Sequence, residues 1–434
     1  MLFFRSKKEF GWAMYDWANS AFATTVMAAF FPAFFKDYWS QGADVTQSTA
    51  ILGAANSLAG LLVALMAPIL GAIADCGSYK KRFLIFFAYL GVLSTAALFM
   101  IHSGEWLLAA LTYVLGTIGF SGSIVFYDSL LPAIAGEKKI DYVSALGYAM
   151  GYLGGGLLIV LNVWMFLSPQ TFGLADAGQA VKVAFLTVAL WWAVFTVPLM
   201  LFVSEPKRGH SKSMRESIRK GLHQLRTTFG KVRHLKTVFL FLVAYWLYID
   251  GVDTIVRMAV DYGKSIGFAT KDLITAIVIV QFVGFPSAIA FGRLGEKIGP
   301  KRAIYLAIAV YMGVVAWAVV MTEKYEFYGL AVAIGLVQGG IQALSRSFYA
   351  RLIPLEQAAE FYGFYNLLGK FAVILGPVLI GLTGLVSGNP RAGIASIALL
   401  FLAGGILLYF VDERKGAREI RYLTAEEGDF QRTT

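Results

Sequence analysis

The chain has 434 residues, of which 58% are hydrophobic and only 15% are charged, and its formal net charge is +10. This composition excludes an ordinary soluble domain, because the apolar residues outnumber those that a soluble core can bury. The positive charges are dispersed among the segments between apolar runs, which argues against a nucleic-acid partner.

Apolar runs of about 20 residues recur along the chain, and each is long enough to cross a hydrocarbon core about 30 Å thick. We expect an all-α membrane protein with twelve transmembrane helices in two six-helix pseudo-repeats, since no segment alternates like a barrel strand. Lys and Arg concentrate at both ends and in the even-numbered loops, so we expect a multi-pass bacterial inner-membrane protein with both termini in the cytoplasm. The predicted spans cover residues 10–36, 47–74, 82–102, 105–131, 140–167, 181–203, 237–262, 271–294, 303–322, 326–351, 361–387 and 391–411.

The first span carries two polar residues one helical turn apart, Asp16 and Asn19, on a face shared with Ala23. Ionisable side chains at membrane depth are costly, so they are candidates for a substrate cavity or a gate. Because Asp16 is close to the inner end of the span, helix capping or snorkelling is the alternative interpretation.

A Gly–acid–basic sequence follows the second span and recurs half a chain later, after the eighth span. The acid can accept hydrogen bonds from the N-terminus of a neighbouring helix, and the basic cluster can bind acids of the opposite bundle. Anchoring of positive charge at the inner surface is the alternative. The gating-loop candidates are Gly71, Asp75, Lys80, Lys81 and Arg82 in the first loop, and Gly292, Glu296, Gly299, Lys301 and Arg302 in the second.

The end of the fourth span is repeated at the end of the tenth, where residues 126–132 align with residues 348–354. Asp128 lies in the first copy. We interpret it as an interfacial acid that pairs with a Lys or Arg of a loop, with a part in gating as the alternative.

The fifth span contains three glycines at four-residue spacing, Gly147, Gly151 and Gly155. Such a stripe predicts a smooth face for close helix packing rather than a binding site. Tyr148 and Tyr152 flank this face and are candidates for lining a cavity.

A polar, basic stretch divides the chain at residues 204–236. We expect a bundle over residues 1–203, this linker, a second bundle over residues 237–411 and a cytoplasmic tail over residues 412–434. Apolar linker residues, among them Ile218, Leu222 and Leu225, recur at helical spacing opposite basic positions. A helix bound to anionic lipids of the inner leaflet and a solvated linker are both open interpretations.

The seventh span places Asp250, Asp253 and Arg257 on one stripe. An ion pair between Asp253 and Arg257 would offset much of the cost of burying them, and substrate contact is the alternative. Asp250 has no partner nearby in sequence. A desolvated acid of this kind suits proton coupling.

The tenth and eleventh spans supply the basic candidates. Arg346 follows Gln342 by one turn, and a polar stripe in an apolar helix favours a cavity face. Lys370 follows Asn366 by one turn, and it can bind a substrate carboxylate or pair with an acid of another helix.

The Gly–acid–basic loop resembles the signature of the major facilitator superfamily. The segments 15–24, 147–155 and 363–370 are similar to the branch called the unknown major facilitator family, which includes a fungal vacuolar amino-acid effluxer linked to autophagy. The resemblance implies the superfamily fold, alternating access, a loop latch that stabilises one access state, and amino acids or peptides as substrates. Cys76 and Ser78 depart from the pattern, so we expect two unequal loops.

We therefore expect a monomeric secondary transporter of a small solute, with proton coupling favoured over sodium. The sequence contains no phosphate-binding loop, and its single cysteine allows no internal disulfide. All four histidines fall in loops. We therefore expect no enzymatic activity, no cofactor and no metal site. Efflux of drugs or metabolites is one alternative. A receptor or scaffold without transport is another, although a scaffold has no reason to keep charges at membrane depth.

Overall fold

The computed structural model describes residues 4–40, 45–205, 213–231, 235–265, 270–371, 375–388 and 390–420, and these residues form helices and short connections. Eleven of the described helical segments are long and apolar enough to cross a membrane. The prediction of an all-α membrane protein is confirmed. The first half contains α1 (Lys7–Ala21), η1 (Phe22–Phe30), α2 (Phe31–Phe34), η2 (Phe35–Trp39), α3 (Val45–Gly77), α4 (Lys80–Ala97), α5 (Trp106–Ala135), α6 (Ile140–Leu167) and α7 (Ala177–Phe202).

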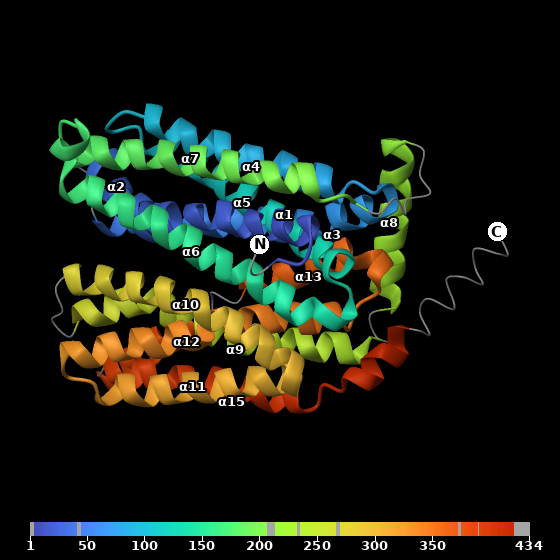
Figure 1. Cartoon of the computed structure of the whole chain (residues 1–434). Helices are drawn as coiled ribbons and strands as arrows, with labels where there is room; N and C mark the ends of the chain where they lie inside the picture. Colours follow the sequence, from blue (N-terminus) through green and yellow to red (C-terminus); the bar gives the residue numbers. More distant parts are fainter. Residues whose placement is uncertain are drawn as a thin grey trace.

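The described part of the linker contains the helix α8 (Met214–Lys231), which covers the residues with helical spacing. Figure 1 shows the first half above the second, with α8 crossing one end of both. The second half contains α9 (Lys236–Ser265), α10 (Thr270–Ile298), α11 (Pro300–Val320), α12 (Lys324–Ala350), η7 (Leu355–Gln357), α13 (Ala358–Phe371), α14 (Leu375–Ser387) and α15 (Pro390–Tyr409).

The buried side chains form two hydrophobic clusters, one drawn almost entirely from residues 12–203 and one from residues 235–411. Each half therefore has its own core, and the contact between the halves is a separate feature of the molecule. Large apolar side chains that remain exposed, such as Leu93 and Leu190, face outward as expected for lipid-facing helices.

The first span is irregular, because α1 continues into the π-helical segments η1 and η2. The sequence predicted a regular helix there. Wide π-helical turns are rare and often lie at functional sites. The regular part, α1, carries Asp16 and Asn19, and both are buried.

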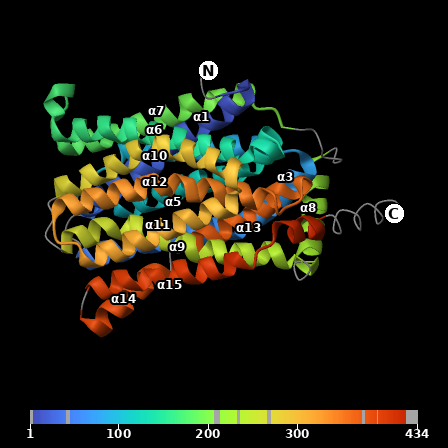
Figure 2. The ribbon, with the colours of Figure 1, turned by 60° about the horizontal axis from the view of Figure 1, so that its bottom comes forward.

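Within the predicted span over residues 361–387, the structure describes α13 up to Phe371 and α14 from Leu375 onward, and residues 372–374 lie outside the description. The N–H groups of Leu375 and Gly376 donate to the Asp250 carboxylate at 3.0 Å each. A helix whose first N–H groups are capped by a side chain begins at that point. Figure 2 shows α14 beside α15 at the edge of the molecule.

The described ends of the chain lie at the end of the bundle that α8 crosses, which we call the α8 end. Arg5 lies over the ring of Tyr142 at the start of α6, and Arg351 lies 3.5 Å from Glu413 and 2.6 Å from Asp141. These contacts place the N-terminal segment and the residues after α15 near the start of α6.

Candidate functional site

A buried charge cluster joins the two halves near the α8 end. Arg346 of α12 is 2% exposed, and its guanidinium lies 2.9 Å from the Asp128 carboxylate of α5 and 3.7 Å from the Asp16 carboxylate of α1. The cluster therefore combines one base from the second half with two acids from the first half. We call these three residues the central cluster.

Further contacts fix the guanidinium in place. Its Nε donates to the Ser144 hydroxyl at 2.9 Å and one Nη donates to the Ser144 carbonyl at 2.8 Å, while the same hydroxyl donates to the carbonyl of Ala343 at 2.8 Å. Ser144 thus ties α6 to α12. The rings of Trp12, Tyr127 and Tyr148 lie 4.9, 5.4 and 4.4 Å from the guanidinium carbon, which adds cation–π attraction in a desolvated site.

Each acid of the central cluster has a second partner. Tyr127 donates its hydroxyl to Asp16 at 2.8 Å, and Asn366 of α13 donates to Asp128 at 3.3 Å. The interpretation of Asp128 as an interfacial acid paired with a loop base is wrong, because its partner is the buried Arg346 of a transmembrane helix. Asp16 contacts side chains of other helices, so its observed contacts are tertiary rather than helix capping.

The glycine stripe of α6 packs against α1, as the sequence predicted. A Cβ at Gly147 would lie 2.6 Å from the Asp16 carboxylate, at Gly151 2.5 Å from the Ser20 hydroxyl, and at Gly155 3.1 Å from the Thr24 methyl. Gly147 thereby makes the space that the Asp16 carboxylate occupies.

Two substitutions on this stripe should differ sharply. Gly147→Ala places a methyl group against Asp16, Tyr127 and Trp12, all within 2.9 Å, so we expect transport to fall by about tenfold or more, given the usual 1–3 kcal/mol cost of overpacking. Gly151→Ala meets mainly the rotatable Ser20 hydroxyl, and it should retain most activity. Initial transport rates at equal protein amounts test the pair. An equal loss of transport in both variants would contradict a specific role for the space that Gly147 leaves for the Asp16 carboxylate.

The two tyrosines beside this stripe both reach across the interface between the halves. Tyr148 lies over Arg346, whereas the ring of Tyr152 fills the space between Gly284 of α10 and Gly339 of α12, where an added Cβ would lie 3.0 and 2.7 Å away. Tyr148 is half-buried and Tyr152 is buried. Whether they line a substrate cavity stays a prediction.

The stripe on α9 is only partly as expected. Asp250 is fully buried and caps α14, and it also accepts a hydrogen bond from Thr254 at 3.1 Å, so the expectation of an acid without local partners is wrong. Asp253 is half-buried and close enough to Tyr148 and Tyr152 for electrostatic interaction. Gln342 is half-buried on α12. The side chains of Arg257 and Lys370 lie outside the described part, so their predicted pairings stay predictions.

The first Gly–acid–basic loop contacts the opposite half. The Asp75 carboxylate accepts hydrogen bonds from the N–H groups of Ala359 and Glu360, at 3.2 and 2.9 Å, where α13 begins. The predicted capping of a neighbouring helix N-terminus is confirmed for Asp75. A Cβ at Gly71, one turn earlier, would overlap the carbonyl oxygen of Ala359, so only glycine allows this approach of α3 to α13.

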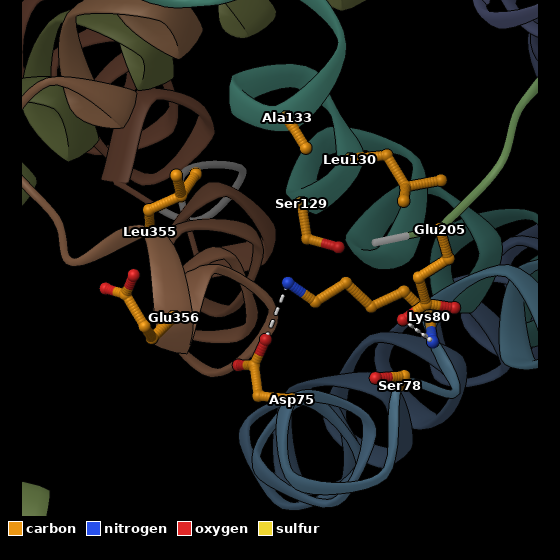
Figure 3. A pocket seen from close by; sticks show the side chains of 9 residues that line it. All are labelled: Asp75, Ser78, Lys80, Ser129, Leu130, Ala133, Glu205, Leu355 and Glu356. Carbon is orange, nitrogen blue, oxygen red and sulfur yellow. Dashed lines mark hydrogen bonds and ion pairs between the residues drawn. The ribbon is translucent and has the colours of Figure 1, made fainter. Parts of the chain in front are cut away.

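The basic residues of these loops bind their own half instead of the opposite one, which corrects the expectation. Lys80 pairs with Asp75 at 2.7 Å (Figure 3). Lys81 donates to the carbonyl of Met200, and Lys301 donates to the carbonyls of Tyr409 and Val411 at the end of α15. Arg82 and Arg302 are exposed, and Arg82 lies over the ring of Tyr79.

A carboxylate that the sequence did not single out completes the first loop. Glu205 accepts hydrogen bonds from the N–H groups of Lys80 and Lys81, each at 3.0 Å, and so caps α4. Burial raises the pKa of Glu205 above its usual value, while these hydrogen bonds act in the opposite direction. Together with Asp75, Lys80 and Glu356 of the second half, Glu205 lines a small pocket (Figure 3).

The second loop is not a copy of the first in its contacts, as Cys76 and Ser78 suggested. Gly292 packs against α6, where an added Cβ would lie 2.5 Å from the Ala145 Cβ, and Gly299 precedes α11 with a φ of 88°. Glu296, however, is exposed. An ion pair between the halves is formed here by Arg351 and Asp141, at 2.6 Å. Sequence reasoning missed this pair, although Arg351 lies in the repeated 348–354 segment.

Comparison with solved structures identifies the fold. The chain has a TM-score of 0.70 to the human organic anion transporter MFSD10 (15% identity, 93% of this chain and 99% of that chain). It has a TM-score of 0.63 to a bacterial homologue of the iron transporter ferroportin in an outward-facing state (13% identity, 93% of this chain and 98% of that chain). The fold is that of the major facilitator superfamily of membrane transporters.

The family follows from sequence. The Vacuole effluxer Atg22-like family matches residues 43–421, and the chain belongs to this family. It is 39% identical to the MFS-type transporter YxiO of Bacillus subtilis (94% of this chain, 95% of that protein). It is also 22% identical to Autophagy-related protein 22 of Yarrowia lipolytica (86% of this chain, 77% of that protein). The chain is therefore a membrane transporter of the major facilitator type, and transporters of this kind are not enzymes.

Proposed function

We propose that this chain is a proton-coupled secondary transporter of small solutes, with amino acids or peptides as first candidates, in a bacterial inner membrane. The central cluster carries the proposal. Two carboxylates face one guanidinium there, so the three described residues of the cluster carry a formal charge of −1 when both acids are ionised. A proton or a substrate cation is the cheapest neutralising group in such a site.

Asp16 is the proposed proton acceptor. The carboxylate of Asp16 lies 3.7 Å from the Arg346 guanidinium, whereas that of Asp128 lies at 2.9 Å. The electrostatic attraction between Asp16 and Arg346 is therefore weaker, and protonation of Asp16 costs less attraction than protonation of Asp128. Opening the α8 end would require Arg346 to separate from Asp128 and Ser144. The Lys and Arg residues concentrated in the loops at this end support its placement in the cytoplasm.

The asparagine variant of Asp16 tests the coupling. Asn cannot take up a proton, so Asp16→Asn should lower uptake driven by a pH gradient about tenfold or more, in line with coupling free energies of 1–3 kcal/mol. Exchange of unlabelled for labelled solute at equal pH should persist. Asp253→Asn is the matched control on the opposite half and should keep the response to the gradient. An unchanged pH dependence in Asp16→Asn would remove the basis of the proposal.

Substrate class is tested on the protein reconstituted in liposomes, with amino acids, dipeptides and cationic dyes supplied with and without a pH gradient. The mixed charge of the site and the resemblance to a fungal vacuolar amino-acid effluxer favour the first two groups. Tyr245 and Tyr365 stack at 4.2 Å in a buried aromatic cluster, and rings of this kind would bind flat dyes if the cluster opened during transport, which makes drug efflux the second candidate. Flux of dyes alone would support this second candidate.

A further inference from the structure

The linker helix α8 lies across the α8 end of both halves (Figure 1) and packs there with a face of small and polar residues. Ser217 and Thr228 are buried, and a Cβ at Gly221 would lie 2.8 Å from the backbone of Ile73 in α3. This face holds the helix in place, so α8 is a packed element rather than a solvated connection.

A second face of α8 is apolar and exposed. Met214, Ile218 and Leu222 are 43%, 41% and 48% exposed, and at 100° per residue they lie about a quarter turn from the face that packs on α3. Exposed apolar side chains on one face of a polar helix are typical of helices at a membrane surface.

Basic residues border this apolar face. Arg215, Arg219 and Arg226 are all exposed, and they lie on the side of α8 opposite to α3. An apolar strip with guanidinium groups along its edge is complementary to a bilayer surface with anionic head groups, where each base contributes about 1 kcal/mol. We call the six residues of these two groups the lipid face.

The third feature of α8 is a bridge between the halves. The Cys76 thiol at the end of α3 donates to the Gln224 side-chain oxygen at 3.3 Å, and the Gln224 amide donates to the Glu360 carboxylate of α13 at 2.5 Å. Gln224 therefore contacts the first half and the second half at once, next to the cap that Asp75 forms on α13.

We infer that the lipid face of α8 binds anionic phospholipid of the inner leaflet, and that this binding holds Gln224 in its bridge and favours the state closed at the α8 end. The inference rests on the proposed cytoplasmic placement of this end. It does not depend on proton coupling or on the substrate, so its tests use no transport assay.

The first test measures lipid contact directly. The full chain with Cys76→Ser and Leu222→Cys carries an environment-sensitive fluorophore and is placed in nanodiscs of phosphatidylcholine, with or without phosphatidylglycerol. We expect a blue shift that increases with phosphatidylglycerol. The same label at Thr227, on another face of α8, is the matched control and should shift much less. Equal spectra at both positions would overturn the docking, and they would favour a solvated face or a protein partner.

The second test measures the bridge through Cys76, the natural single cysteine. Phosphatidylglycerol should slow alkylation of Cys76 by a soluble maleimide on the order of fivefold, the lower end of typical coupling between sites. The variant R215Q/R219Q/R226Q should lose this effect. The variant R414Q/K415Q/R418Q removes the same charge from exposed positions after α15 and should retain it. The inference would be overturned if the alkylation rate of Cys76 did not depend on phosphatidylglycerol, or if phosphatidylglycerol changed this rate equally in both triple variants.

Discussion

Arg346→Gln is expected to abolish transport and to lower the free energy of unfolding by about 3–5 kcal/mol, the usual cost of breaking a buried ion pair from one side. The guanidinium is 2% exposed and makes hydrogen bonds to Asp128 and to both oxygens of Ser144. Removing it leaves two carboxylates buried without a counter-charge. It also removes the hydrogen bonds from Arg346 to α5 and α6, while the bond from Ser144 to Ala343 remains.

Control variants separate the effect of the Arg346 charge from the effect of its hydrogen-bond geometry. Arg346→Lys keeps the charge but cannot bind Asp128 and Ser144 together, so it should recover part of the stability and little of the transport. Adding Asp128→Asn to Arg346→Gln should recover stability, because one buried charge is removed. Arg351→Gln breaks a pair in which Arg351 is 27% exposed and Asp141 is 1% exposed, so it should cost more than a surface pair but less than Arg346→Gln. Thermal unfolding in detergent and initial transport rates measure all four. A stable, active Arg346→Gln protein would show that the central cluster is dispensable.

The span pattern, the helical linker and the glycine packing of α6 were all predictable from sequence, because hydropathy and residue spacing act locally along the chain. Asp16 and Arg346 were also recognised, since an ionisable residue within an apolar run is visible without a structure. Family membership was predictable from short motifs such as residues 15–24.

The partners of these charges were not predictable. Arg346 is 218 residues from Asp128 and 202 from Ser144, so no spacing rule relates them. Asp250 looked unpartnered because its partners are backbone N–H groups at the start of α14, and a helix start within an apolar run leaves little trace in sequence. Asp141 and Arg351 lie at helix ends, where charges are ordinary, so nothing marked them as a contact between the halves.

The second prediction with a large effect concerns the contact of α3 with α13. We expect that one methyl group added at Gly71 opens the α8 end. A Cβ at Gly71 would overlap the Ala359 carbonyl oxygen and lie 2.8 Å from the Glu360 Cα. These are backbone atoms, so no side chain can rotate away, and the overlap is relieved only when the halves separate. Asp75 and Gln224 would then lose their partners on α13.

We therefore expect Gly71→Ala to raise the alkylation rate of Cys76 by about tenfold, within the range that corresponds to 1–3 kcal/mol of overpacking. Gly60→Ala is the matched control on the same helix, because a Cβ there meets nothing within 4 Å, and its rate should stay at the wild-type level. Thermal unfolding of both variants distinguishes opening from loss of structure. A folded Gly71→Ala protein with unchanged Cys76 reactivity would contradict the closure at this end, whereas raised reactivity confined to Gly71→Ala would identify the α3–α13 crossing as one of the contacts that keep the α8 end closed.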